Sequence, residues 1–216
     1  MHGVPGVVVL SSLPTKIPQL SPIHIFDMNG FSDHDAEAVL EYWFGGARPE
    51  DNYKTKWFPT GSKDLQSKAD AEITAKFAPL LARALNLNPA DYPLRPSFLI
   101  AVIIVLDQFS RHIYRSLTPD NPLRKKVDAL ASVATDKLTS MPAWDQNLSV
   151  AEFVFTLMPY RHASTLDSLN KVMSSIDSRF QKEQENVELL TKFKKQTVRR
   201  LQHLQDRAQV CIVVFK

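Results

Sequence analysis

The stretch FLIAVIIVLDQFSRHIYR, residues 98–115, is the segment from which the fold is best inferred. Its first nine residues are all apolar, whereas a transmembrane helix needs about 20, so we expect a core element and no transmembrane segment. Strands seldom exceed about ten residues, and because the pattern continues for longer we predict a helix. At about 100° per residue, one face of this helix carries Asp107, Arg111, Tyr114 and Arg115. These polar groups follow directly on buried isoleucines, so they must be paired or must receive a ligand.

The composition predicts one mainly helical domain. The chain has 216 residues, 44% of them hydrophobic, which is enough for one substantial core. Only 6 glycines are present, and long stretches rich in Ala, Leu, Lys, Glu and Gln carry no hairpin signals, which favours helices. We therefore expect an all-α single domain of about seven antiparallel helices in residues 31–216. Residues 1–30, which prolines interrupt, should form a flexible N-terminal arm.

Apolar periodicity and end signals place the helices. Ser32 should cap the first helix, and Gly45-Gly46 should end it with a left-handed residue. Pro159 should end the fifth helix, because proline clashes with the preceding turn. His162 would then lie just beyond a break, where a helix start offers free N–H groups. The expected helices span residues 33–44, 65–84, 98–115, 127–138, 150–158 and, as two helices with a boundary near 177–184, 166–210.

Charge and cysteine usage narrow the function classes. A net charge of +3 is mild for this length, so we expect no DNA binding. The single cysteine, Cys211, allows no internal disulfide, so a reducing compartment is expected: the cytoplasm, with a mitochondrion as the less favoured alternative. We expect no metal site and no cofactor, because metal-ligand spacings, a P-loop and a dinucleotide-binding glycine pattern are all lacking. Asp33-His34-Asp35 is explained by helix capping.

Four segments resemble one family when they are read in order: VLEYWFGG, KWF, LIAVIIVLDQFSRHIYR and MPYRHA. Together they are similar to the family catalogued as domain of unknown function 924, over roughly Asp35 to Leu166. The resemblance implies an all-helical, tetratricopeptide-repeat-like array with no established activity, substrate or cofactor. The matching positions are Trp43, Phe44, Gly45, Trp57, Phe58, Leu106, Asp107, Gln108, Phe109, Arg111, Tyr114, Arg115, Met158, Pro159 and His162.

Two departures from the family pattern affect what the resemblance implies. The family usually has an acidic residue before the histidine and Ser-Glu after it. This chain has Arg161, Ala163 and Ser164 there, so a carboxylate partner for His162 is missing at these neighbouring positions. The aromatic and arginine-rich ending of the family is also not recognisable after Gln196.

The polar residues of 98–115 have a structural and a functional interpretation. Asp107 and Arg111 stand at i, i+4 and are favoured as a structural ion pair. In the functional interpretation Asp107 engages only one of Arg111 and Arg115, which leaves a guanidinium for a carboxylate or phosphate. Our first hypothesis is a binding module for a partner protein or a small anionic ligand. Its candidate ligand-binding residues are Asp107, Gln108, Arg111, Tyr114, Arg115, His162, Trp43 and Trp57.

Two other function classes stay open, and so does the oligomeric state. In an enzyme of unspecified reaction class, His162 would be the catalytic acid or base and Arg111 would stabilise negative charge. The basic run from Lys192 to Arg200 would contact RNA in a third, less favoured class, since a solvated helix face is the preferred explanation of the run. Large aromatic residues such as Trp43 and Trp57 are also more often core than ligand walls.

Overall fold

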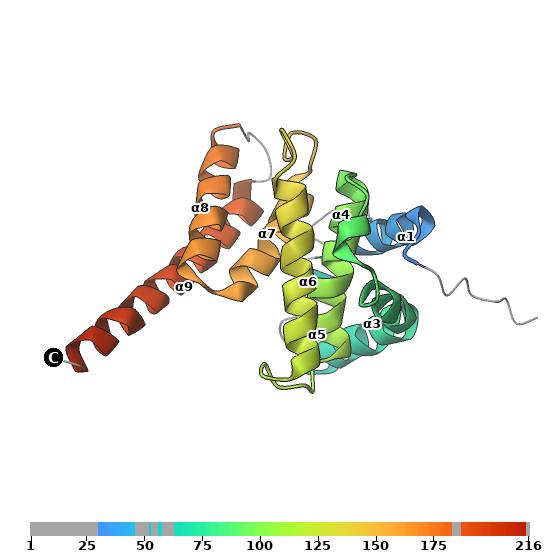
Figure 1. Ribbon diagram of the computed structural model, residues 1–216, viewed down its shortest axis with the longest axis horizontal. Helices are drawn as coiled ribbons and strands as arrows, with labels where there is room; N and C mark the ends of the chain where they lie inside the picture. The colour runs from blue at the N-terminus through green and yellow to red at the C-terminus, as the bar shows by residue number, and fades with distance from the viewer. Residues whose placement is uncertain (1–29, 46–51, 53–55, 58–62, 183–186, 215–216) are drawn as a thin grey trace, which may run out of the picture.

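The computed structural model describes residues 30–45, 52, 56–57, 63–182 and 187–214, and all secondary structure within them is helical, which confirms the all-α prediction. Seven helices are found there, one of them made of three consecutive segments (Figure 1). The proposed N-terminal arm lies almost wholly outside these residues. The elements are α1 (Asp33–Phe44), α3 (Lys63–Ala84), the turn η2 (Pro89–Asp91), α4 (Pro96–Ile103), η3 (Ile104–Phe109), α5 (Ser110–Ile113), α6 (Pro122–Thr139), α7 (Val150–Ala163), α8 (Leu166–Phe180) and α9 (Val187–Val214).

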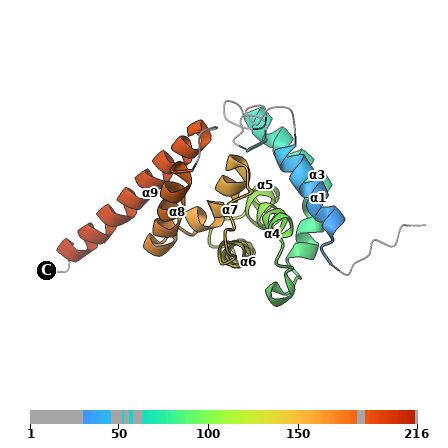
Figure 2. The same ribbon diagram turned by 90° about the horizontal axis from the view of Figure 1, so that it is seen from above.

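The segments α4, η3 and α5 form the central helix, residues 96–113, and it occupies the middle of the molecule. Helices α1 and α3 lie on one side of it, and α7, α8 and α9 lie on the other (Figures 1 and 2). Every side chain from Phe98 to Ser110 is buried. By length and composition alone Pro96–Ile113 is apolar enough to cross a membrane, but 78% of it is buried by the other helices. This is the burial of a core helix.

A π-helical segment, η3, interrupts the regular winding of the central helix. Such a segment adds a residue to a turn, so the side chains that follow it are rotated relative to a uniform helix. Asp107 and Gln108 lie within this segment and are buried together with the apolar residues, in line with the half-buried polar site that the upstream isoleucines indicated. Segments of this kind frequently occur at functional sites.

The helix ends agree with the sequence in part. Ser32 caps α1 as predicted: its hydroxyl accepts from the Asp35 N–H and its own N–H donates to the Asp35 carboxylate. The predicted left-handed exit is wrong for Gly45, which is extended (φ −61°, ψ 150°). Glycine is needed there for a different reason, because a Cβ would lie 2.2 Å from the Glu41 carbonyl oxygen.

The predicted end of α7 at Pro159 is also wrong. The helix continues to Ala163 and ends at Ser164, which is left-handed (φ 53°). Proline loses only one backbone hydrogen bond, and the packing of α7, whose residues 150 and 151 and 153–160 are all buried, is sufficient to keep the turn helical. His162 therefore lies in the last turn of α7 and not at a helix start.

Candidate functional site

Asp107 is the centre of a buried polar cluster. Its side chain is 1% exposed and is contacted by three polar side chains. Arg111 donates from Nη2 at 2.9 Å, Gln108 from Nε2 at 2.5 Å, and the Nδ1 atom of His162 lies 2.8 Å from Oδ1. Burial by itself raises the pKa of Asp107, but the charges and hydrogen bonds of His162 and Arg111 outweigh it and hold this pKa well below its usual range. Asp107 is therefore a carboxylate at neutral pH.

Arg111 joins the central helix to α6. Its Nη2 atom lies 2.9 Å from a carboxylate oxygen of Asp107 and 2.9 Å from one of Asp128. The predicted pairing of Asp107 with Arg111 is therefore confirmed. One nitrogen serves both carboxylates, while the buried Nε of Arg111 has no hydrogen-bond partner among the described residues.

The free guanidinium predicted at Arg115 is not found. Arg115 binds Asp70 of α3 with two nitrogens, Nε at 2.5 Å and Nη2 at 2.9 Å. His112, which is buried, shares the same carboxylate through Nδ1 at 2.8 Å. Asp70 precedes Arg115 by 45 positions, so the periodicity of the central helix contains no sign of this pair. Arg115 fixes α3 to the central helix.

His162 has a carboxylate partner in the structure, although the residues next to it in the sequence supply none. This partner is Asp107. The two residues are 55 positions apart and meet because α7 packs against the central helix. Asp107 holds the ring through Nδ1, which leaves Nε2 without a hydrogen bond among the described residues and fixes the direction in which it points. This arrangement suits a histidine that exchanges a proton or a hydrogen bond through Nε2.

Arg161 is a half-buried guanidinium with no carboxylate partner among the described residues. Its Nη2 donates to the Gln196 side-chain oxygen at 3.0 Å, its Nη1 meets the Met158 sulfur at 3.6 Å, and its plane lies over the Phe193 ring at 5.7 Å. Burial and the positive charge of Arg200 lower the pKa of Arg161 to about 10, while the charge of the Asp107 carboxylate acts in the opposite direction. Buried cations are ordinarily paired, but Arg161 forms no direct ion pair with a carboxylate in the part of the chain that the structure describes.

Two further arginines lie one helical turn from residues of this cluster. Arg200 follows Gln196, which bonds Arg161, by four positions on α9, and Arg124 precedes Asp128, which bonds Arg111, by four positions on α6. Burial and the charge of Arg111 lower the pKa of both arginines, while Asp128 and Asp107 act in the opposite direction on Arg124. Arg124 donates only to the Tyr114 carbonyl, at 3.4 Å, and its buried Nε has no partner among the described residues, as is also true of Arg161. We call Arg111, Arg124, Arg161 and Arg200 the arginine group.

The arginine group is assembled from four elements of the fold. Arg111 is on α5, Arg124 on α6, Arg161 on α7 and Arg200 on α9. Seen from above, α7 lies between the pair formed by α8 and α9 and the central helix (Figure 2). Of these four arginines, the sequence predicted only Arg111 as a ligand-binding residue. Arg161 stood out as a departure from the family pattern and Arg200 as part of a basic run, but the sequence did not indicate that the two lie near the same site.

A comparison with models of protein families matches residues 39–209 to the family described as bacterial protein of unknown function (DUF924). The chain belongs to the DUF924 family. The predicted resemblance is confirmed, and it extends past Leu166 through α8 and most of α9. The matched region therefore includes residues 197–209, where the sequence by itself showed no recognisable family ending. Neither the curated proteins nor the solved structures gave a match.

The aromatic candidates of this DUF924 chain lie in the core. Trp43 is 0% exposed and Trp57 is 5% exposed, so neither presents a surface to a ligand. The Trp57 indole N–H donates to the Trp43 carbonyl at 2.9 Å, and both rings pack edge-on against Phe155. Gln108 supports Asp107, and Tyr114 ends α5 with its carbonyl facing Arg124. Trp43, Trp57 and Gln108 are thus buried, while Tyr114 is partly exposed.

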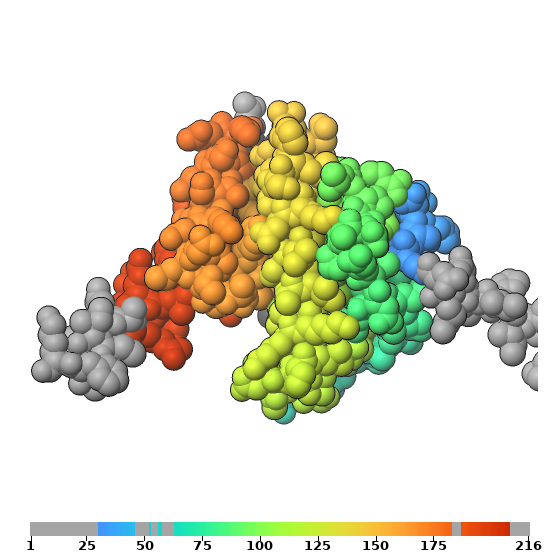
Figure 3. All heavy atoms as spheres, viewed as in Figure 1, coloured from blue at the N-terminus to red at the C-terminus, as the bar shows by residue number. Residues whose placement is uncertain are grey.

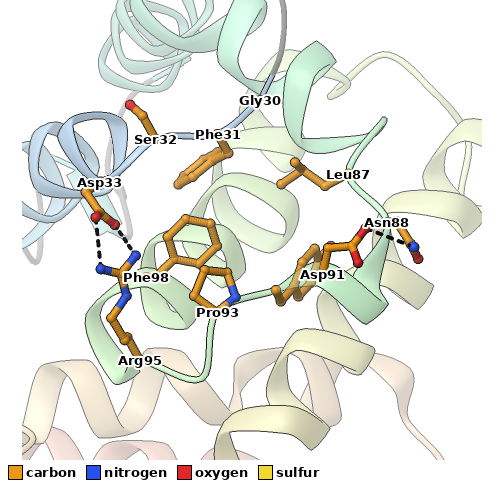
Figure 4. A pocket seen from close by; sticks show the side chains of 11 residues that line it. Gly30, Phe31, Ser32, Asp33, Leu87, Asn88, Asp91, Pro93, Arg95 and Phe98 are labelled. Carbon is orange, nitrogen blue, oxygen red and sulfur yellow. Dashed lines mark hydrogen bonds and ion pairs between the residues drawn. The ribbon is translucent and has the colours of Figure 1, made fainter.

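A surface pocket of about 370 Å³ lies elsewhere, between the start of α1 and the α3–α4 connection (Figure 4). Phe31 and Phe98 form its apolar wall, and Asp33 pairs with Arg95 at its edge. Asp33 and Arg95 of this pocket thus neutralise each other, whereas Arg124, Arg161 and Arg200 form no ion pair with a carboxylate among the described residues. Among the described residues, no group of three or more His, Cys, Asp or Glu side chains is placed to hold a metal ion.

Proposed function

We propose that this DUF924 protein binds a small anionic ligand at the arginine group, beside the Asp107–His162 pair. Arg161 is the observation that carries the proposal, because among the described residues its half-buried guanidinium meets an amide oxygen, a sulfur and a ring but no carboxylate at ion-pair distance. A partly desolvated cation of this kind attracts an anion more strongly than an exposed one does. The ligand would supply the counter-ion that the fold does not.

A small ligand is favoured over a protein partner by the exposure of these side chains. Arg111 is 25% exposed and His162 is 18% exposed, so a single phosphate or carboxylate group reaches them more easily than a flat protein surface does. A protein partner stays the other form of this hypothesis, and it would have to insert an acidic side chain.

Thermal unfolding tests the proposal, because a ligand that binds only the folded state raises its stability by mass action. We expect millimolar phosphate or dicarboxylate to raise the Tm of the wild type and not that of Arg161→Met. Arg199→Met is the matched control, since Arg199 is an exposed arginine on α9 and should leave the response unchanged. An equal response of wild type and Arg161→Met would contradict the proposal.

An enzyme is the second candidate, and the Asp107–His162 hydrogen bond favours it. A carboxylate that orients a histidine through Nδ1 is a recurring arrangement for acid–base catalysis by Nε2. Arg111 would stabilise negative charge on the reacting group. For any turnover found with an anionic substrate, His162→Gln should abolish the reaction while anion-induced stabilisation persists. Retained turnover in His162→Gln would exclude this role.

Two finer proposals from the sequence have weaker support. RNA association through α9 is disfavoured because Lys192 pairs with Glu188 and Lys194 with Asp177, which neutralises part of the basic run. A steep fall of RNA affinity with salt would be needed to favour it. The tetratricopeptide-like array is supported by the packing of each of α6, α7 and α8 on the next helix along the chain.

A further inference from the structure

Given the proposed anion site, we propose that its ligand is a tetrahedral dianion of the phosphate monoester class, and not a carboxylate. The arginine group supplies charge, and its donors belong to several helices; both properties match a phosphate group better than they match a carboxylate. The residues around the site would select the organic part of the ester.

The charge of the site is the first argument. The four guanidiniums of the arginine group are opposed by two carboxylates, those of Asp107 and Asp128, which contact Arg111. The remaining formal charge is that of two guanidiniums, before any contribution from His162. A dianion neutralises this charge, whereas a single carboxylate leaves half of it. A phosphate monoester carries about −1.5 to −2 at pH 7.

The direction of the donors is the second argument. The guanidiniums of Arg124, Arg161 and Arg200 come from three different helices, and none of them has a carboxylate partner among the described residues. A carboxylate has two oxygens in one plane and is best met by a single arginine fork. A phosphate monoester has three terminal oxygens in a tetrahedral arrangement, so it can accept from arginines that belong to several helices.

The anchoring of the donors is the third argument. Arg111 is held by Asp107 and Asp128, and Arg161 is held between Gln196 and the Phe193 ring. Donors that are fixed before the ligand arrives lose little side-chain entropy when it binds. Arg200 lies on α9, which packs on α7 and α8. The position of Arg200 in the site is therefore set by this packing.

Isothermal titration calorimetry of the full chain tests the ligand class with methyl phosphate, sulfate, acetate and succinate at pH 7.5. We expect methyl phosphate and sulfate to bind at least tenfold more tightly than acetate and succinate. Arg200→Met should weaken methyl phosphate binding by about tenfold or more, and Arg200→Lys by less, because lysine keeps the charge without the fork. Arg199→Met should stay within about twofold of the wild type, and circular dichroism checks that each variant is helical.

The pH dependence tests the requirement for a dianion. A phosphate monoester has its second pKa near about 6, so its dianion fraction rises about tenfold between pH 5 and pH 7.5. Sulfate keeps its charge over this range and therefore reports any effect of pH on the protein itself. We expect the ratio of methyl phosphate to sulfate affinity to rise about tenfold. A constant ratio would contradict selection of the dianion.

The outcomes separate this inference from the proposed function. Tighter binding of succinate or acetate than of methyl phosphate would overturn the phosphate class while leaving an anion site. Binding of methyl phosphate that Arg200→Met does not weaken would overturn the location of the site. No heat with any of the four anions would overturn both proposals.

Discussion

Replacing Asp107 by asparagine should destabilise the protein strongly, because Asp107 is the buried counter-ion of two residues. Its side chain is 1% exposed and bonds Arg111 and His162. Breaking a buried pair by removing one partner costs about 3–5 kcal/mol. Arg111 retains Asp128, so we expect the lower end, about 3 kcal/mol. For a chain of this length that loss lowers the Tm by about 6–12 °C.

The assay is thermal unfolding followed by circular dichroism, with Asp167→Asn as the control. Asp167 is 79% exposed and pairs with Lys171 one turn later, an arrangement worth about 0.3–0.5 kcal/mol, so the control should change the Tm by less than about 2 °C. An equal, small change in Asp107→Asn and in the control would refute the reasoning that Asp107 is a buried counter-ion.

The stability difference between the wild type and Asp107→Asn should depend on pH, because the pKa of Asp107 is lowered in the folded state. A carboxyl group whose pKa is lower in the folded state stabilises the fold above its unfolded pKa, about 3.9, and loses this contribution as the pH falls through the folded value. The difference in unfolding free energy between wild type and Asp107→Asn should therefore be constant from pH 7 to pH 5. It should shrink below about pH 4. A difference that already falls between pH 7 and pH 5 would assign the effect to another group.

Three further outcomes are expected. Arg161→Met should raise the Tm without ligand, because it replaces a half-buried cation with an apolar side chain against Phe193. Such a change is worth up to about 1–4 kcal/mol, and a lower Tm would contradict the expectation. Ser149→Ala should cost about 1 kcal/mol in a urea titration, because it removes the capping box of α7; no change would mean that the cap is not needed. Burial lowers the pKa of His112, so its stabilising contribution is complete above about pH 6.5 and is lost as the pH falls; His112→Gln should lose less stability than the wild type between pH 7 and pH 5, and an equal loss would exclude His112 as the cause.

The helices were predictable where their signals are local. Ser32 and the apolar stripe after it define α1, and the same is true of the long stripe of α3. Pro159 shows the limit of this reasoning, because the burial of α7 on both sides outweighs a local preference that is worth about 3 kcal/mol. Tertiary packing of that kind is not encoded within one turn of sequence.

The candidate site was predictable only in its local part. Asp107 and Arg111 are four positions apart, so their pairing follows from helical geometry. Asp70 and His162 reach the central helix from α3 and α7, at separations of 45 and 55 positions from Arg115 and Asp107 respectively, and a single sequence does not show which helices meet. The π-helical segment also rotated the residues after it, which no uniform periodicity anticipates.

The central claim is that the arginine group holds a tetrahedral anion, and a crystal grown with selenate tests it most directly. Selenate has the shape and charge of sulfate, and its selenium gives an anomalous signal that locates it without bias. We predict an anomalous peak within hydrogen-bonding distance of Arg161 and of at least one of Arg124 and Arg200. Peaks found only elsewhere on the surface, with Arg161 still bonded to Gln196 alone, would contradict the account.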